Sequence, residues 1–318
     1  MKVLFIDTVH EILQKRLEEK GVTCIDGTRF SMKECQSELQ KGVHGIVVRS
    51  RFRMDAALLD VAGDLKFIAR SGAGMENIDE DYCRKRNIRL FNAPEGNRTA
   101  VGEHALGMLL ALFNNLKKGD AEVRKGIWDR EGNRGIELTG KTVGIIGYGN
   151  NGSAFAKVLR GFDCRILAYD KYRTGFGDEW VEESYVEQVY EQAEIISFHI
   201  PQNAETIHWA NTAFFQKVKH PFYLVNLSRG KIVQTNALMD AIETGKVKGA
   251  VLDVLEYESS SFEQAFSEEI SPDFQRLLNS EQVLLSPHVG GWTNESYYKL
   301  SSVLADKIEA VYFTNDLT

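Results

Sequence analysis

The stretch TVGIIGYGNNGSAFAKVLRGFDCRILAYD, residues 142–170, decides the fold. An apolar run leads into Gly147, Gly149 and Gly152 in the spacing G-x-G-x-x-G, and an amphipathic stretch follows. A second apolar run then ends in Asp170, 18 residues after the last glycine. The glycine pattern alone is weak, but strand, glycine turn, helix, strand and acidic residue in this order predict a dinucleotide-binding unit.

Each glycine has a physical role in this prediction. Gly147 allows the tight turn, Gly149 lets the backbone approach a pyrophosphate, and Gly152 lets the helix pack closely on the strand. The helix begins at Asn150 and Asn151, where unpaired N–H groups and a partial positive charge favour phosphate. The alternative is a purely structural β-α turn.

Asp170 indicates which dinucleotide binds. Its carboxylate can accept hydrogen bonds from both ribose hydroxyls of NAD, and it would repel the 2′-phosphate of NADP. Lys171 and Arg173 follow directly and could soften this preference. The sequence therefore predicts NAD as the cofactor.

Outward from this unit, short apolar runs alternate with longer amphipathic stretches along the chain. Alternation of this kind predicts an α/β protein in which helices cover both faces of a parallel sheet. The other apolar runs are VLFID, GIVVRS, EIISFHIP, FYLVNLSRG, GAVLDVL and QVLLSPHVGG. Ligands bind at the carboxyl ends of such strands, so candidate site residues should follow them.

The length of 318 residues predicts two domains. Residues 99–119 read as one long apolar helix that connects them, and the tail NESYYKLSSVLADKIEAVYF is amphipathic at helical spacing. We therefore expect a discontinuous, flavodoxin-like substrate domain, residues 1–98 and 290–318, around an inserted NAD-binding Rossmann domain, residues 99–289. Both domains are expected to contain a doubly wound parallel sheet.

Composition excludes several classes of protein. With 38 basic and 45 acidic residues the net charge is -7, which argues against a nucleic-acid-binding surface. No apolar stretch has the length of a membrane span or of a secretory signal, so a cytoplasmic protein is expected. The four cysteines are scattered and the seven histidines form no cluster at ligand spacing, so no metal site is expected.

Four polar residues at strand ends point to chemistry. Arg229 can hold a carboxylate bidentately, as hydride transfer to a 2-oxo acid requires, although a solvated surface arginine is the alternative. Asp253 can bind the carboxamide of nicotinamide, and Glu258 can fix the tautomer of a histidine, although either could also be a helix cap or lie in a solvated loop. His288 can exchange the hydroxyl proton, because imidazole titrates near neutral pH. His199, in FHIP, is expected to pack near the cofactor beside Pro201.

The chain resembles the D-2-hydroxyacid dehydrogenase family, in particular its D-3-phosphoglycerate dehydrogenase branch, which acts in serine biosynthesis. The similarity runs through most of the chain. It is carried by the blocks RSGAGMENID, NAPEGNRTAVGEHALGMLLAL, ELTGKTVGIIGYGNNG, VNLSRGKIV, GAVLDVLEYE and SPHVGG.

This resemblance implies that Arg229, Glu258 and His288 are the catalytic residues. It implies that the cofactor contacts the glycine loop and a set of strand-end residues, namely Asn150, Asn151, Asp170, Leu227, Ser228, Asp253, Gly290 and Gly291. A nest of backbone amides would bind the substrate carboxylate, formed by Ser71, Gly72, Ala73 and Gly74. It also implies a homodimer formed through the NAD-binding domains, with Trp128 in a loop that crosses between subunits.

The segment VVRSRFRMD, residues 47–55, resembles the phosphoglycerate branch most closely. There the resemblance implies that Arg49, Ser50 and Arg51 face the substrate phosphate, with Arg70 nearby. The most favoured substrate is therefore 3-phosphoglycerate, converted to 3-phosphohydroxypyruvate. The alternatives are a reductase of glyoxylate, hydroxypyruvate or D-lactate type, and an NAD(H)-sensing protein resembling the corepressor relatives.

The chain departs from the family pattern at three places. Asn151 stands where the family has Ile or Val, Ser259 replaces the proline after the catalytic glutamate, and the segment 259–281 is long. The last two differences concern the loop on the substrate side. The chain also ends after the returning helix, so no C-terminal serine-sensing domain is expected.

Overall fold

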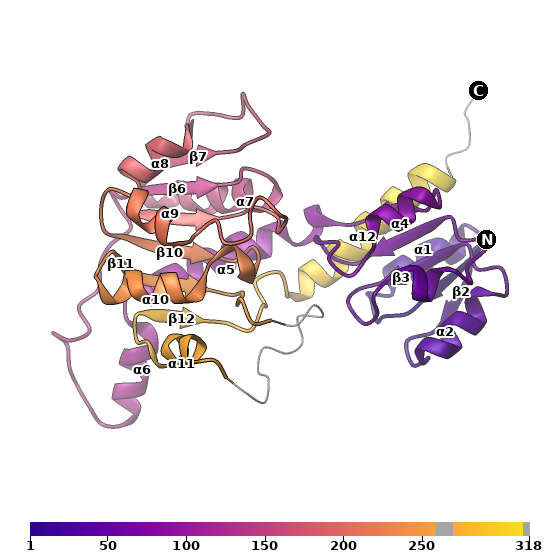
Figure 1. The fold of residues 1–318 in the computed structure, drawn as a ribbon, viewed down its shortest axis with the longest axis horizontal. Helices are drawn as coiled ribbons and strands as arrows, with labels where there is room; N and C mark the ends of the chain where they lie inside the picture. The colour runs from indigo at the N-terminus through magenta and orange to yellow at the C-terminus, as the bar shows by residue number, and fades with distance from the viewer. Residues whose placement is uncertain (259–269, 314–318) are drawn as a thin grey trace. The chain divides into compact units, whose positions relative to one another are not determined.

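The computed structural model describes residues 1–258 and 270–313, and these form two compact units (Figure 1). One unit holds Met1–Asn97 and the segment that begins at Trp292, and the other holds Arg98–Glu258 and the segment that ends at Gly291. Each unit contains one sheet in which all the strand pairs are parallel. The predicted α/β class is therefore confirmed.

The first unit contains a five-stranded sheet in the order β2-β1-β3-β4-β5, which is the flavodoxin-like order. Its strands are β1 (Lys2–Phe5), β2 (Thr23–Asp26), β3 (Gly45–Val48), β4 (Phe67–Arg70) and β5 (Arg89–Phe91). Its helices are α1 (Ile12–Glu19), α2 (Met32–Leu39), α3 (Ala56–Leu59), α4 (Glu80–Lys85) and α12 (Asn294–Tyr312).

Both faces of the five-stranded sheet are buried. Val3 and Phe5 point to one apolar cluster, while Leu4 and Ile6 point to the other, as the two-residue period of a strand requires. Helix α12 covers the first of these faces with Leu300, Leu304, Ala305 and Ile308. The C-terminal helix is thus part of the core of the N-terminal unit.

The second unit contains a seven-stranded sheet in the order β12-β11-β10-β9-β6-β7-β8, a Rossmann order with one additional strand. Its strands are β6 (Thr142–Ile146), β7 (Arg165–Tyr169), β8 (Val181–Glu183), β9 (Ile195–Phe198), β10 (Phe222–Asn226), β11 (Val247–Leu252) and β12 (Val283–Leu285). Its helices are α6 (Leu116–Arg124), α7 (Asn150–Leu159), α8 (Val186–Gln192), α9 (Thr212–Lys217), α10 (Thr235–Glu243) and α11 (Pro272–Asn279), with short 3₁₀ turns at η1 (Arg160–Phe162) and η2 (Gly230–Ile232).

The strand order of the second sheet reverses between β6 and β9, which are neighbours although β7 and β8 intervene in sequence. The glycine turn follows β6 at this switch point. In open parallel sheets, ligands bind beyond the carboxyl ends of the strands at such a point. The fold therefore positions the glycine turn, Asp170 and the ends of β9 to β12 along one edge of the sheet.

The single helix predicted for residues 99–119 is wrong. The structure has α5 (Pro94–Phe113) and then a separate α6, and Asn115 between them has a left-handed backbone with φ of 50°. A left-handed residue ends an α-helix, and asparagine tolerates this conformation better than most residues. The adjacent polar residues Asn114 and Asn115 were the sequence signal for this break, and the interpretation of residues 99–119 as one helix passed over them.

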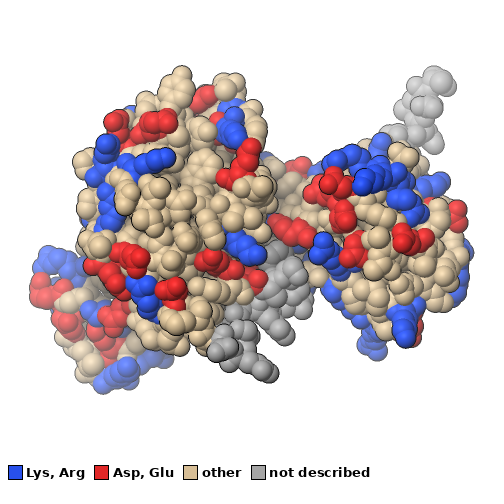
Figure 2. All heavy atoms as spheres, viewed as in Figure 1, with Lys and Arg blue, Asp and Glu red and all other residues tan. Residues whose placement is uncertain are grey.

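The surface mixes charges of both signs, and Figure 2 shows Lys and Arg interspersed with Asp and Glu on the face that it presents. None of the described helices is both long enough and apolar enough to cross a membrane. In the described ranges, no group of three or more His, Cys, Asp or Glu is arranged to hold a metal ion.

Candidate active site

The glycine turn after β6 requires glycine at two positions. Gly147 has φ of +96°, and a Cβ there would lie 2.6 Å from the carbonyl oxygen of His199. A Cβ at Gly152 would lie 2.0 Å from the carbonyl oxygen of Gly147, so helix α7 packs directly on the turn. A Cβ at Gly149 would instead meet nothing within 4 Å, so the backbone there borders open space. This is the geometry that a close approach of a pyrophosphate needs.

The N-terminus of α7 fits an anionic ligand. Gly149 is the N-cap and no side chain caps the helix, so the first-turn amides at Asn150 and Asn151 are not satisfied by a capping side chain. The Oδ1 atom of Asn151 is buried and has no hydrogen-bond partner. Uncapped amides and the helix dipole together favour a phosphate at this place.

Asp170 lies directly after β7 and is held by backbone amides. Its Oδ2 accepts from the amide of Tyr148 at 2.8 Å, and its Oδ1 accepts from the amides of Tyr172 and Arg173 at 2.9 and 3.0 Å. A carboxylate has about four acceptor directions, so these amides use three of them. The carboxylate is therefore fixed at the strand end by backbone amides on both of its oxygens. This leaves about one acceptor direction, fewer than the two ribose hydroxyls that the sequence analysis expected it to bind.

His288 and Glu258 form a hydrogen-bonded pair. The Nδ1 atom of His288 lies 2.7 Å from Oε2 of Glu258, and the other carboxylate oxygen accepts from the amide of Leu255. Because Nδ1 faces the carboxylate, Nε2 is the ring nitrogen that is directed away from Glu258. His288 also has an uncommon left-handed backbone, with φ of 55°.

Arg229 lies in a turn that contacts the loop carrying Glu258. A Cβ at the neighbouring Gly230 would lie 1.8 Å from the carbonyl oxygen of Leu255, so only glycine permits this contact. Asn226, at the end of β10, organises the turn: its Nδ2 donates to the carbonyl of Arg229 at 2.9 Å, and its Oδ1 accepts from the hydroxyl of Ser228 at 2.8 Å. Two sequence-distant strand ends are thereby brought together.

Asp253 forms hydrogen bonds with residues on both sides of His288 in the chain. Its backbone carbonyl accepts from the amide of His288 at 2.8 Å, and its carboxylate accepts from the amides of Val289 and Gly290 at 2.9 and 2.7 Å. Its Oδ1 also accepts from the hydroxyl of Ser286 at 2.5 Å. Asp253 is therefore buried beneath the histidine and positions its backbone from both sides.

A polar chain extends from Asp253 to helix α5. The Nε2 atom of His104 lies 3.1 Å from the hydroxyl of Ser286, which in turn donates to Asp253. Burial acts to raise the pKa of the Asp253 carboxyl, but the side-chain and backbone hydrogen bonds outweigh it and hold the pKa below its ordinary value. Asp253 is thus ionised under ordinary conditions.

The remaining cofactor candidates lie around the same sheet edge. Leu227 and Ser228 are buried, and a Cβ at Gly290 would come within 3.2 Å of Leu227 and 2.8 Å of Asp253. Gly291 follows at the end of this unit. Pro201 is exposed after β9.

The ring of His199 packs beneath the glycine turn. Its centroid lies 5.4 Å from that of Phe155, its Nε2 lies 2.8 Å from the hydroxyl of Ser197, and its buried Nδ1 has no partner. Burial lowers the pKa of His199 to about 3. The ring is thus neutral and supports the turn from below.

In the first unit, Arg49, Ser50 and Arg51 form a loop after β3. Their three amides donate to Oδ2 of Asp7 at 2.6, 2.9 and 3.1 Å. The guanidinium of Arg51 donates to the carbonyls of the neighbouring segments, including Thr28 at 2.5 Å and Phe30 at 2.7 Å. This arrangement gives Arg51 a structural part in holding the loop.

Arg49 is oriented differently. Its guanidinium carbon lies 4.4 Å from the centre of the Trp292 ring, a cation–π contact, and Trp292 is 57% exposed. Arg70 is buried beside it, and its Nε donates to the carbonyl of Arg49 at 3.1 Å. Arg49 is therefore the arginine of this loop whose charged group lies on an exposed aromatic surface.

The predicted nest at Ser71 to Gly74 is partly used by the protein itself. The amide of Ser71 donates to the carbonyl of Val48 at 2.8 Å, and the amide of Gly72 donates to the carbonyl of Arg70 at 2.9 Å. Within the described part of the chain, the amides of Ala73 and Gly74 have no acceptor. Two of the four predicted amides are thus available to an anion.

Sequence analysis missed four residues that organise these sites: Asp7, His104, Asn226 and Ser286. Asp7 and Asn226 lie at the ends of apolar strands, a position that should have singled them out. His104 was considered only as one of the seven histidines, and its partner lies 182 residues away in the sequence. The predicted effect of Ser259 and of the first half of the segment 259–281 lies outside the described residues.

Known proteins resemble this chain over most of its length. Residues 106–290 match the family described as D-isomer specific 2-hydroxyacid dehydrogenase, NAD binding domain. The D-3-phosphoglycerate dehydrogenase of Archaeoglobus fulgidus is 34% identical over 97% of this chain and 56% of the relative. The hydroxypyruvate reductase of Thermotoga maritima is 32% identical over 83% of each chain.

A solved structure agrees with these relatives. The D-lactate dehydrogenase from Aquifex aeolicus, complexed with NAD and lactic acid, has a TM-score of 0.81 and 26% identity, covering 98% of this chain and 95% of that one. The chain spans only about half the length of several curated phosphoglycerate dehydrogenases that it matches, 56% and 57% for those of Archaeoglobus fulgidus and Methanocaldococcus jannaschii. The chain belongs to the D-isomer specific 2-hydroxyacid dehydrogenase family and contains the NAD-binding domain of that family.

Proposed function

We propose that the protein is an NAD-dependent oxidoreductase that interconverts a D-2-hydroxy acid and its 2-oxo acid. The observation that carries this proposal is the pair of His288 and Glu258, 2.7 Å apart, in which the second carboxylate oxygen is fixed by a backbone amide. Such a pair sets the histidine tautomer needed for proton exchange. Arg229 lies in the turn that packs against the same loop.

The proposed roles follow from the chemistry of each group. In the oxidation, Nε2 of His288 takes the proton of the substrate hydroxyl, and Glu258 stabilises the imidazolium that forms. Arg229 binds the substrate carboxylate and orients the carbon that reacts. NAD, when bound, accepts the hydride from that carbon. Holding the cofactor falls to the glycine turn, Asp170 and the strand-end residues predicted from the sequence.

We propose 3-phosphoglycerate as the substrate, which would place the protein in serine biosynthesis. Arg49 supports this, because its guanidinium lies against an exposed indole and offers a positive charge to a phosphate. The amides of Ala73 and Gly74 would receive part of the substrate carboxylate. The relatives named D-3-phosphoglycerate dehydrogenase support the same assignment.

One observation favours an unphosphorylated 2-oxo acid instead. The guanidinium of Arg51 donates to backbone carbonyls, so the loop supplies fewer cations to a phosphate than its sequence implies. The relative named hydroxypyruvate reductase and the structure with lactic acid fit this second candidate. The two candidates share the chemistry at His288 and differ only in the group that Arg49 would meet.

The deciding experiment follows the loss of NADH absorbance with 3-phosphohydroxypyruvate, hydroxypyruvate and glyoxylate, side by side. A large preference in kcat/KM for the phosphorylated acid supports the first candidate, and Arg49→Gln should then remove most of that preference. Comparable rates with all three acids support the second. Turnover with none of them, together with intact NADH binding, would contradict the proposed activity and favour an NAD(H)-sensing role.

We also propose a homodimer formed through the NAD-binding units. Helix α6 and the residues after it expose several large apolar side chains, and Trp128 is 79% exposed. Exposed apolar groups gathered on one segment are typical of an interface. Light scattering should give twice the monomer mass, and Trp128→Glu should shift the protein toward the monomer. A wild-type monomer at micromolar concentration would contradict this assembly.

A further inference from the structure

Two cations follow the carboxylate that is expected to receive the adenosine ribose. Lys171 and Arg173 come directly after Asp170, at the end of β7. NADP differs from NAD by a phosphate on this ribose, which carries between one and two negative charges near neutral pH. A cation at this place is the usual means of accepting that phosphate. The contacts of these two side chains therefore determine whether they can bind the 2′-phosphate of NADP.

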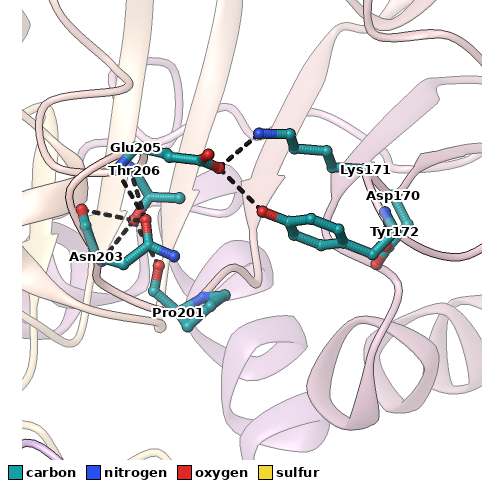
Figure 3. A network of polar contacts seen from close by, with 7 residues as sticks. All are labelled: Asp170, Lys171, Tyr172, Pro201, Asn203, Glu205 and Thr206. Atoms are coloured by element: carbon teal, nitrogen blue, oxygen red, sulfur yellow. Dashed lines mark hydrogen bonds and ion pairs between the residues drawn. The ribbon is translucent and has the colours of Figure 1, made fainter. Parts of the chain in front are cut away.

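Both side chains are engaged by the protein, and Figure 3 shows the contact of Lys171. The Nζ atom of Lys171 lies 2.5 Å from Oε2 of Glu205, in the loop after β9. The guanidinium of Arg173 donates to the carbonyl of Tyr148 at 2.7 Å, within the glycine turn. The hydrogen bond with Glu205 raises the pKa of Lys171, and Lys171 lowers the pKa of Glu205, so both partners are ionised. The charge of Lys171 is thus matched by a carboxylate.

Glu205 is held by more than the lysine. The hydroxyl of Tyr172 donates to the same Oε2 at 2.9 Å, and the amide of Glu205 donates to Oδ1 of Asn203 at 2.9 Å. The hydroxyl of Thr206 donates to the carbonyl of Pro201 at 2.6 Å, which closes the loop on itself. Figure 3 shows Lys171 and Tyr172 pointing together toward Glu205. An isolated exposed ion pair is weak, but a shared acceptor on a tied loop favours one geometry.

We infer that Glu205 is a specificity-determining residue that makes the protein prefer NAD to NADP by holding and neutralising Lys171. Asp170 repels the 2′-phosphate, and Glu205 neutralises one of the two cations that could offset this repulsion. The inference concerns the NAD-binding unit alone. It holds for either substrate candidate, and its test does not depend on turnover.

The test measures dissociation constants of NADH and NADPH by fluorescence titration. Four proteins are compared: the wild type, Glu205→Gln, Lys171→Ala and the double variant. Glu205→Gln keeps the size of the side chain and removes its charge, so Lys171 becomes available. We expect Glu205→Gln to bind NADPH about fivefold more tightly, with NADH affinity within about twofold of the wild type. The gain should shrink at high salt, because the charges are exposed.

The other variants distinguish an effect of Glu205 through its ion pair with Lys171 from a direct effect of the Glu205 charge on the cofactor. Lys171→Ala should leave both affinities close to the wild type, and adding Glu205→Gln to it should give no gain for NADPH. Tyr172→Phe is a matched control that keeps the ion pair, so it should leave the ratio of the two affinities unchanged. An unchanged ratio in Glu205→Gln would overturn the inference. An equal gain in the absence of Lys171 would also overturn it, because Glu205 would then act through its own charge.

Discussion

The seven-stranded unit contains two histidine–glutamate pairs that look alike. His288 pairs with Glu258, and His208 pairs with Glu256, each with a distance of 2.7 Å. Both histidines have a left-handed backbone, with φ of 55° and 54°, and both glutamates lie in the loop after β11. Distance and residue type therefore do not distinguish a catalytic pair from a structural one.

The two pairs differ in the nitrogen used and in what the glutamate does next. His208 contacts Glu256 through Nε2, and the second oxygen of Glu256 accepts from the amide of Thr235 at the start of α10. That pair fastens a loop to a helix. His288 uses Nδ1, which directs Nε2 away from the glutamate, and it follows a strand end beside Asp253. The ring nitrogen that contacts the glutamate and the place of the pair in the sheet therefore support the proposed catalytic role for His288 and a structural role for His208.

The comparison is tested most strongly by removing each histidine. His288→Ala should lower kcat by about 10²- to 10⁴-fold, because it removes the proton acceptor, while NADH affinity stays nearly unchanged. His208→Ala should leave kcat within about twofold and lower the free energy of unfolding by about 1 kcal/mol, the size of one lost hydrogen bond. Steady-state kinetics and denaturant titration provide the two readouts. Similar losses of kcat in both variants would show that the pairs are not functionally distinct.

The glutamates provide the next test. Glu258→Gln should lower kcat by about 10- to 100-fold, because an amide can no longer stabilise the imidazolium and can present the wrong group to Nδ1. Glu256→Gln is the matched control in the same loop and should leave kcat nearly unchanged. Denaturant titration of both variants separates the explanations, since loss of catalysis alone should leave the free energy of unfolding nearly unchanged. A loss of kcat with an equal loss of stability in both variants would contradict a specific role for Glu258.

Ser286 should act as a positioning residue for His288. Its hydroxyl links His104 to the carboxylate that holds the histidine backbone. Ser286→Ala should lower kcat by about tenfold with little change in KM, because the catalytic nitrogen is displaced while the substrate groups remain. Ser286→Thr, which keeps the hydroxyl, should restore most of the activity. If the two variants behave alike, the hydroxyl is not what positions the loop.

Much of the fold could be predicted because its signals are local. The runs before the glycine turn and before Arg229 are almost fully buried and therefore read as continuous apolar stretches. The run before His288 lies at the sheet edge and is only partly buried, but its three residues are all apolar. The strands that the sequence analysis did not list include β2, β5 and β8, which lie at sheet edges or carry exposed residues. These strands bury few residues, so their apolar signal is short. Strand β4 was not listed either, although it is internal to its sheet and fully buried.

Site residues could be predicted where each lies in one recognisable sequence motif. Contacts between segments that are far apart in the sequence could not be predicted. Arg229, Glu258 and His288 each follow a recognisable strand. Three contacts join residues that are far apart in the sequence and could not be predicted from one motif. They are the hydrogen bond between Glu258 and His288, the hydrogen bond from the Arg49 amide to Asp7, and the ion pair between Lys171 and Glu205. Charge alone suggested that Arg51 faces a phosphate, whereas packing turns its guanidinium toward backbone carbonyls.

A third histidine extends the comparison, because His199 has no carboxylate partner. Burial lowers its pKa from 6.5 to about 3. The unfolded chain therefore takes up a proton below about pH 6.5 that the folded chain does not, and stability is lost as the pH falls through this range. Between about pH 7.5 and 5.5, the wild type should lose about 1 kcal/mol of unfolding free energy because of this difference in proton uptake.

His199→Gln should not show this loss, because glutamine does not titrate and its amide can still reach the hydroxyl of Ser197. The measurement is urea denaturation of both proteins at the two pH values. The free energy of unfolding of the wild type, relative to that of the variant, should fall by about 1 kcal/mol on acidification, while kcat for the variant remains measurable at neutral pH. Equal changes in the two proteins would mean that His199 is protonated in the folded chain. A histidine without a carboxylate partner would then be charged beneath the glycine turn, so the presence of a glutamate would not explain which of the three histidines is protonated.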